Sequence, residues 1–208
     1  MIPRTTRFYR TVKATGRNAL AAVLVFSTVV HATSVVEVSV EELLRNSALV
    51  FEGQVVDVQV RENSKHAIQT LVTFEILDVI KGDVPGGKLT LGFLGGTVAG
   101  RQLSVSNMHI PLMHEHGIYF VESTARTQVH PFYGWSQGHL LLEEVADGTE
   151  RVFTRSGRPV TGIQHSDGKR PGDLSSGVAR GLVTGDSGEA AAALDRREFK
   201  RLLRAMRW

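Results

Sequence analysis

The chain has 208 residues, no cysteine and a formal net charge of +3. Because cysteine is absent, disulfide bonds, thiolate metal ligands and a cysteine nucleophile are excluded. Five of the 24 basic residues lie in residues 1–32, so the other 19 are outnumbered by 21 acidic residues and no nucleic-acid partner is indicated.

The amino-terminal residues have the three parts of a secretory signal peptide. Basic residues without acidic ones come first, the apolar run 19–30 follows, and Val30-His31-Ala32 places small residues two apart. We therefore predict a signal peptide at 1–32, cleaved after Ala32, and an exported protein in the periplasm or outside the cell. The alternative is a retained anchor, but the apolar run is shorter than the ~20 residues that span a bilayer. No membrane span is expected after cleavage.

The first predicted elements are a short helix and two long strands. Ser39 and Glu42 have the spacing of a capping box, which indicates one or two helical turns. Residues 49–60 are rich in β-branched side chains, and their alternation changes phase beside Gly53, which predicts a bulge or sharp bend in one long strand. Apolar and polar residues alternate over 67–80, where a second long strand is expected.

Shorter strands follow, separated by glycine-rich turns. They are expected at 89–93, 103–105, 118–121, 140–145 and 152–154. Six or seven strands with almost no helix between them predict a mainly β domain at 33–161, an antiparallel small barrel or sandwich with a short N-terminal helix. The long, bent first strand favours the barrel.

The carboxyl-terminal part has a different composition. Residues 162–188 are rich in glycine, serine and charged residues, which predicts a flexible linker. Residues 189–208 carry apolar side chains at helical spacing and predict a C-terminal amphipathic helix. Residues 33–150 hold seven basic and 15 acidic residues, whereas 151–208 hold 12 and six. We interpret the basic helix as a cover for its own core, and docking on an acidic partner or an anionic membrane surface is the alternative.

Several segments of the β region resemble a group of uncharacterised exported bacterial proteins. The matching segments, which agree in order and spacing, are 49–58, 72–82, 91–96, 117–121 and 134–138. The pattern is also distantly similar to the OB-fold modules of netrin-like domains and of tissue inhibitors of metalloproteases. This second resemblance implies a protein-binding barrel whose partner is a secreted protease, above all a metalloprotease. The chain lacks the amino-terminal cysteine that those inhibitors place on the protease zinc.

No catalytic constellation is recognised in the sequence. The segment Gly134-Trp135-Ser136-Gln137-Gly138 matches the G-x-S-x-G pattern, in which a strand and a helix flank the catalytic serine. Here a strand is expected to follow, so a turn that presents Trp135 is the better interpretation. We predict a non-enzymatic protein. A hydrolase that uses Ser136 is a further interpretation of this segment.

The predicted protein-binding surface lies in the loops at 107–117 and 130–138. Met108, Tyr133 and Trp135 belong to residue types that are enriched at interfaces, so we predict that they contact a protein partner.

The first of these loops also suggests a different function. His109, His114 and His116 are close in sequence, and imidazole ligands suit copper, nickel or zinc in an oxidising compartment. The alternative prediction is therefore a periplasmic metal-binding protein that holds a transition metal at these histidines. No other cofactor is expected.

Overall fold

The computed structural model describes residues 35–63, 66–166 and 173–206. The predicted signal peptide, residues 1–32, lies outside them. The fold is mainly β, with 44% strand and 15% helix, as the sequence predicted. No helix in the described residues is both long and apolar enough to cross a membrane.

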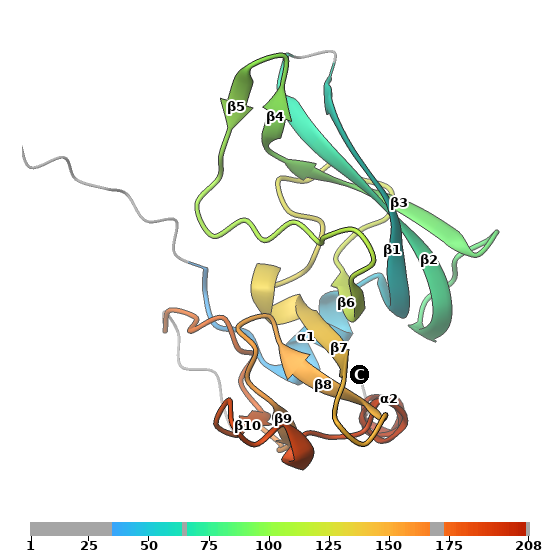
Figure 1. Ribbon diagram of the computed structural model, residues 1–208, viewed down its shortest axis with the longest axis vertical. Helices are drawn as coiled ribbons and strands as arrows, with labels where there is room; N and C mark the ends of the chain where they lie inside the picture. Colours follow the sequence, from blue (N-terminus) through green and yellow to red (C-terminus); the bar gives the residue numbers. More distant parts are fainter. Residues whose placement is uncertain (1–34, 64–65, 167–172, 207–208) are drawn as a thin grey trace, which may run out of the picture. The chain divides into compact units, whose positions relative to one another are not determined.

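Six antiparallel strands form one sheet in the order β3-β2-β1-β6-β7-β8 (Figure 1). The edges of this sheet are β3 and β8, and no closed barrel is detected among the described strands, so the predicted OB-like barrel is not confirmed. The strands of the sheet are β1 (Leu49–Glu62), β2 (Ile68–Lys81), β3 (Lys88–Leu94), β6 (His116–Val121), β7 (His139–Glu144) and β8 (Glu150–Thr154). Two smaller sheets pair β4 (Gly96–Val98) with β5 (Arg101–Leu103) and β9 (Val160–Ile163) with β10 (Leu182–Thr184).

The long strand β1 pairs irregularly with β2, as the phase change beside Gly53 predicted. The register shifts at three places, and one of them lies between Glu52 and Gly53. A side chain at position 53 would bring its Cβ to 2.7 Å from the Phe51 ring and 2.8 Å from the Glu75 carbonyl oxygen. Glycine therefore permits this close approach, and the bulge lies in the part of β1, residues 50–54, that pairs with both β2 and β6.

Both faces of the sheet are buried, because successive residues of a strand point to opposite sides. On β1, Val50 belongs to one core and Phe51 to the other. The helix-side core includes Val40, Leu43, Leu44, Val50, Ile118, Phe120, Leu140, Leu142, Val152, Phe199 and Leu203. The aromatic core includes Leu49, Phe51, Val55, Val72, Phe74, Leu91, Phe93, Tyr119, Val121 and Phe132.

Two α-helices contribute to the helix-side core. The first, α1 (Val40–Asn46), begins with the predicted capping box: Ser39 Oγ accepts from the Glu42 N–H at 3.1 Å, and the Glu42 carboxylate accepts from the Ser39 N–H at 2.9 Å. The second, α2 (Arg196–Ala205), is capped by Asp195, whose carboxylate accepts from backbone N–H groups of the first turn. Each cap satisfies N–H groups that have no partner within the helix.

The segment that the sequence predicted to be a linker, 162–188, pairs with the rest of the domain at several points. Thr184 of β10 pairs with Val160 of β9, Gly185 donates its N–H to the Pro159 carbonyl at 3.0 Å, and Arg180 donates its backbone N–H to the Val38 carbonyl at 2.9 Å. The predicted helix at 189–208 consists of a 3-10 turn, Ala190–Ala192, followed by α2. Backbone hydrogen bonds do not require apolar side chains, so the polar composition of this segment does not prevent pairing.

Candidate functional site

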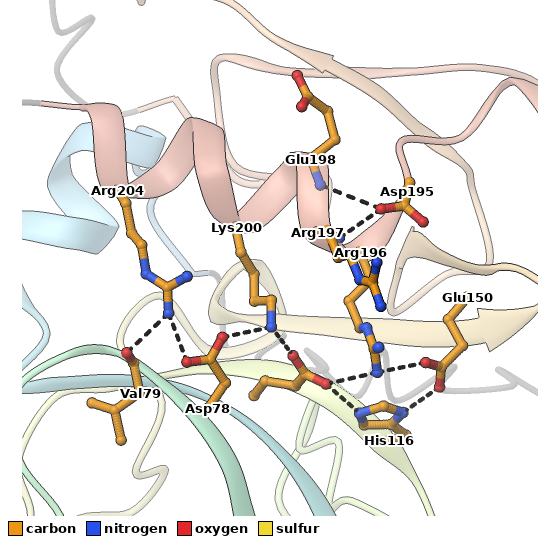
Figure 2. Close-up of polar contacts among 11 residues, drawn as sticks. Asp78, Val79, His116, Glu150, Asp195, Arg196, Arg197, Glu198, Lys200 and Arg204 are labelled. Atoms are coloured by element: carbon orange, nitrogen blue, oxygen red, sulfur yellow. Dashed lines mark hydrogen bonds and ion pairs between the residues drawn. The ribbon is translucent and has the colours of Figure 1, made fainter.

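Two buried polar clusters lie on opposite sides of the sheet. The first, the Glu52 network, joins α2 to the strands (Figure 2). Glu52 lies on the helix side of β1, and only 3% of its side chain is exposed. Its carboxylate accepts from His116 Nε2 at 3.0 Å and from Arg196 Nη1 at 3.1 Å, and Lys200 Nζ donates to its second oxygen.

Further carboxylates complete the Glu52 network. His116 Nδ1 and Arg196 Nη1 contact the two carboxylate oxygens of Glu150 at 2.8 and 2.5 Å. Asp78 accepts from Lys200 Nζ at 2.6 Å and from Arg204 Nη2 at 2.7 Å. The basic face of α2 therefore pairs with acidic residues of its own sheet, in agreement with the interpretation of this helix as a cover.

The charges around Glu52 hold it in its ionised form. Burial alone would raise the pKa of this carboxyl, but hydrogen bonds from His116 and Lys200 and the positive charges of Lys200 and Arg196 outweigh burial and lower the pKa to about 2. All buried side-chain nitrogens and oxygens of Glu52, His116 and Lys200 have partners within the described residues. Such a saturated network fixes α2 to the sheet.

The second cluster, the histidine cluster, comprises Glu115, Tyr119, His130, Trp135 and His139 and borders the aromatic core. The side chain of His139 is fully buried, and its Nε2 lies 2.6 Å from Glu115 Oε1. Because an ionised carboxylate only accepts, His139 donates through Nε2, and the Tyr119 hydroxyl donates to the same oxygen at 3.2 Å. These two donors fix the carboxylate of Glu115 beneath the loop that carries it.

The hydrogen bond from Tyr119 depends on a glycine two residues before it. A Cβ at Gly117 would lie 2.9 Å from both the Cζ and the hydroxyl oxygen of Tyr119 and 2.5 Å from the Leu140 carbonyl oxygen. The absence of a side chain at Gly117 thus lets the Tyr119 ring fold back toward Glu115.

His130 lies in an almost entirely aromatic environment. Its ring stacks on Trp135, with centroids 5.0 Å apart and planes inclined by 21°, and it meets Phe93 and Phe132 edge-on at 5.4 Å. Nδ1 accepts the backbone N–H of Phe132 at 3.2 Å, so the ring proton of neutral His130 is on Nε2. Burial, followed by repulsion from His139 and His109 in their charged forms, lowers the pKa of His130 to about 3.

The histidine cluster is not saturated. His130 Nε2, His139 Nδ1 and Arg155 Nε are buried and have no hydrogen-bond partner in the part of the chain that the structure describes. Burial lowers the pKa of His139 more than its bond with Glu115 raises it, and the charge of Arg155 lowers it further. Buried polar atoms without partners are rare in native proteins, which makes this cluster a candidate functional site.

The three residues predicted to contact a protein partner occupy different environments. Met108 packs against the aromatic core, whereas Tyr133 packs against the helix-side core and its hydroxyl accepts from Asn46 Nδ2 at 2.8 Å. Trp135 covers His130 and has a positive φ of 58°. Met108 and Tyr133 therefore lie on opposite sides of the sheet, and all three side chains are partly buried.

In the loop that carries Met108, the exposed apolar residues are Leu112 and Met113, and 64% and 45% of these residues are exposed. They lie in a turn closed by the Glu115 N–H, which donates to the Leu112 carbonyl at 3.0 Å. The turn is attached to β1, because His114 donates its N–H to the Val55 carbonyl at 3.0 Å and Glu115 accepts from the Val55 N–H at 2.9 Å. We refer to residues 112–115 as the apolar turn.

The histidines predicted to bind metal lie in different surroundings. Both ring nitrogens of His116 contact carboxylates of the Glu52 network, and His114 is exposed in the apolar turn. The positive charges of Arg155 and His139 lie close enough to lower the pKa of His109, after the larger effect of burial. Within residues 35–63, 66–166 and 173–206, no group of three or more histidine or carboxylate side chains could hold a metal ion.

The segment that matches the G-x-S-x-G pattern forms a short 3-10 helix, Trp135–Gly138, which leads directly into strand β7. A nucleophile elbow needs a helix after the serine, so the context that would support Ser136 as a nucleophile is missing at this position. The strand predicted to follow the segment is confirmed, and the segment itself is a single 3-10 turn.

No protein-family model, curated protein or solved structure matches the chain. The function therefore has to be inferred from the residues of the chain itself.

Proposed function

We propose that the protein is an exported, non-enzymatic β module that binds another protein through the apolar turn. The observation that carries this proposal is the exposure of two adjacent apolar side chains, Leu112 and Met113, at the end of a loop that is otherwise firmly attached. Methionine is enriched at interfaces and adapts its shape to a partner.

The rigidity of the apolar turn supports binding in a second way. Two backbone hydrogen bonds to Val55 and the contact between Glu115 and His139 hold the turn in one conformation before a partner arrives. A partner that docks there orders little additional chain, so less of the binding free energy is lost to conformational entropy.

We further propose that the domain is related to the OB-like modules of netrin-like domains and metalloprotease inhibitors, and that its partner is a secreted protease. The bulged first strand and the meander β1-β2-β3 support this relationship, because bulges are how a sheet curls toward a barrel. Without a cysteine, the contact with a protease would be made by side chains such as Leu112 and Met113 rather than by a cysteine on the zinc.

The test is affinity capture from the exported fraction of the native cell, with residues 33–208 as bait. We expect one stoichiometric partner that is lost when Leu112 and Met113 are both changed to serine. The matched control is Leu77→Ser, because Leu77 is 51% exposed on β2, outside the apolar turn. If both variants captured the same proteins as the unchanged bait, the assignment of the binding surface would be wrong.

A further inference from the structure

We propose that the histidine cluster is an acid-sensitive latch: protonation of His130 and His139 releases the two loops that cover the aromatic core, 104–115 and 122–134, while α2 stays attached. Its functional consequence, release of the bound protein in acid, rests on the function proposed above. The conformational change itself is a property of the chain alone.

His130 can take up a proton only by breaking its present contacts. The second proton would go to Nδ1, which now accepts the Phe132 N–H, so two donors would face each other. The rings of Phe93, Phe132 and Trp135 surround the imidazole. The titratable groups that act on it are His109 and His139, and either of them in its charged form would repel the new charge.

His139 is fixed from several elements. Glu115 from loop 104–115 and Tyr119 from β6 face it, and Arg155, which follows β8, contributes a positive charge. A second proton on Nδ1 would create a buried N–H without an acceptor among the described residues. Glu115 favours the charged form, but the buried position and Arg155 oppose it, so the charged ring is best accommodated once the loops have opened.

Both loops depend on these two histidines. His139 holds Glu115 and thereby the apolar turn. His130 holds the Phe132 N–H, next to the points where residues 129–133 bond to the ends of β3 and β6. When His130 and His139 become charged and turn toward water, the contacts that these two side chains make with 104–115 and 122–134 are lost together, and only the backbone hydrogen bonds to β1, β3 and β6 remain.

The opposite side of the sheet responds to acid differently. Three basic side chains, His116, Arg196 and Lys200, surround Glu52, so α2 stays attached until the carboxylates of the network are protonated. As the pH falls, the loops 104–115 and 122–134 are therefore released first, and α2 is released at a lower pH.

Hydrogen exchange of the full chain, read by mass spectrometry at pH 7 and pH 5 and corrected for the intrinsic exchange rates, tests this latch. We expect protection of 104–115 and 122–134 to fall about 10-fold or more. If the opening of a loop is coupled to the uptake of one proton, its opening equilibrium changes by this factor between pH 7 and pH 5. Protection of residues 196–206 should stay unchanged. If all three segments lost protection to the same extent, or if the two loops did not respond, the proposal would be overturned.

Variants with non-titrating side chains sharpen the experiment. In His130→Asn the amide oxygen can still accept the Phe132 N–H, and in His139→Gln the amide N–H can still donate to Glu115. The double variant should show no difference between pH 7 and pH 5 in the loops, and His66→Gln, at an exposed histidine, should behave like the unchanged chain. If the double variant does not fold, the segment comparison in the unchanged chain decides. No partner is present, so failure of this test leaves the proposed binding surface standing, and failure of the capture test leaves the latch standing.

Discussion

The two sides of the sheet contain the same kinds of side chain but use them in different ways. On the helix side, Glu52 is buried among three basic side chains, and every buried polar atom of its immediate partners His116 and Lys200 is satisfied. On the aromatic side, His130 and His139 are equally buried, but each has a ring nitrogen without a partner in the described chain. A network in which every buried polar atom has a partner stabilises one structure. A network with unpartnered buried atoms has an unfavourable free energy, which a proton or a conformational change can relieve. We therefore assign structural stability to the helix side and function to the aromatic side.

The largest effect is expected from breaking the saturated side. Glu52→Gln removes the charge that His116, Arg196 and Lys200 share, and removal of one partner from a buried ion pair costs about 3–5 kcal/mol. Urea unfolding at pH 7 measures the loss. Glu144→Gln, at an exposed position on β7, is the control and should change the free energy of unfolding by less than about 0.5 kcal/mol. Equal stability of the two variants would mean that the Glu52 network does not hold α2.

The next effect is the acid response of the unsaturated side. The pKa of folded His130 is about 3, below its value of about 6.5 in the unfolded chain, so the unfolded chain takes up the proton first as the pH falls. Stability from neutral His130 is therefore complete above pH 6.5 and is lost progressively toward pH 3, with about 2 kcal/mol lost by pH 5. Glu52, with a pKa of about 2, contributes stability that is lost only below about pH 4.5. Urea unfolding of His130→Asn between pH 7 and pH 5 should show a flatter pH dependence than the unchanged chain, and identical slopes would contradict this account.

Whether a contact on either side of the sheet can be predicted from the sequence depends on how far apart its two residues are along the chain. The capping box of α1 and the bulge at Gly53 rest on neighbouring residues, and both were predicted. Glu52 and Lys200 are 148 residues apart, and Glu115 and His139 are 24 apart, so no local pattern indicates that they meet. A signal for the first pair does exist: Glu52 is a charged residue within the apolar run of a predicted strand, and such a residue needs a partner.

The candidate site shows the same limit more strongly. Residue types common in interfaces pointed to Met108, Tyr133 and Trp135, but the pattern could not show that packing against the cores leaves these side chains partly buried. The neighbours of Met108 in the same loop, Leu112 and Met113, are the exposed ones, because the turn is held by Val55 of β1, more than 50 residues earlier. Which histidine nitrogens lack a partner depends on the packing of segments that are far apart in the sequence, and composition does not specify that.

A smaller effect is expected when one hydrogen bond of the histidine cluster is removed. Tyr119→Phe deletes the buried hydroxyl that donates to Glu115, and the loss of one such bond costs about 1 kcal/mol. Thermal unfolding compared with Tyr133→Phe, whose hydroxyl bonds to an exposed side chain, checks the difference. If Tyr133→Phe were the more damaging change, Glu115 would not be held as we describe.

The smallest effect on stability is expected in the apolar turn. Leu112 and Met113 are exposed, so changing both to serine should alter the free energy of unfolding by no more than about 0.5 kcal/mol while binding of the partner is lost. Circular dichroism during thermal unfolding, run beside the capture experiment, separates the two effects. A strongly destabilised double variant would mean that these side chains support the fold and are not kept for a partner.

The most direct test of the central claim is an NMR titration of the histidine rings in the folded protein, with ring nitrogen shifts to report which nitrogen carries the proton. The account predicts that His130 and His139 remain neutral, with their protons on Nε2, well below the pH of about 6.5 at which an unperturbed imidazole becomes charged. Titration of His130 and His139 at about pH 6.5, or protons found on Nδ1, would contradict the claim that the aromatic side keeps two buried, unsaturated histidines as its functional feature.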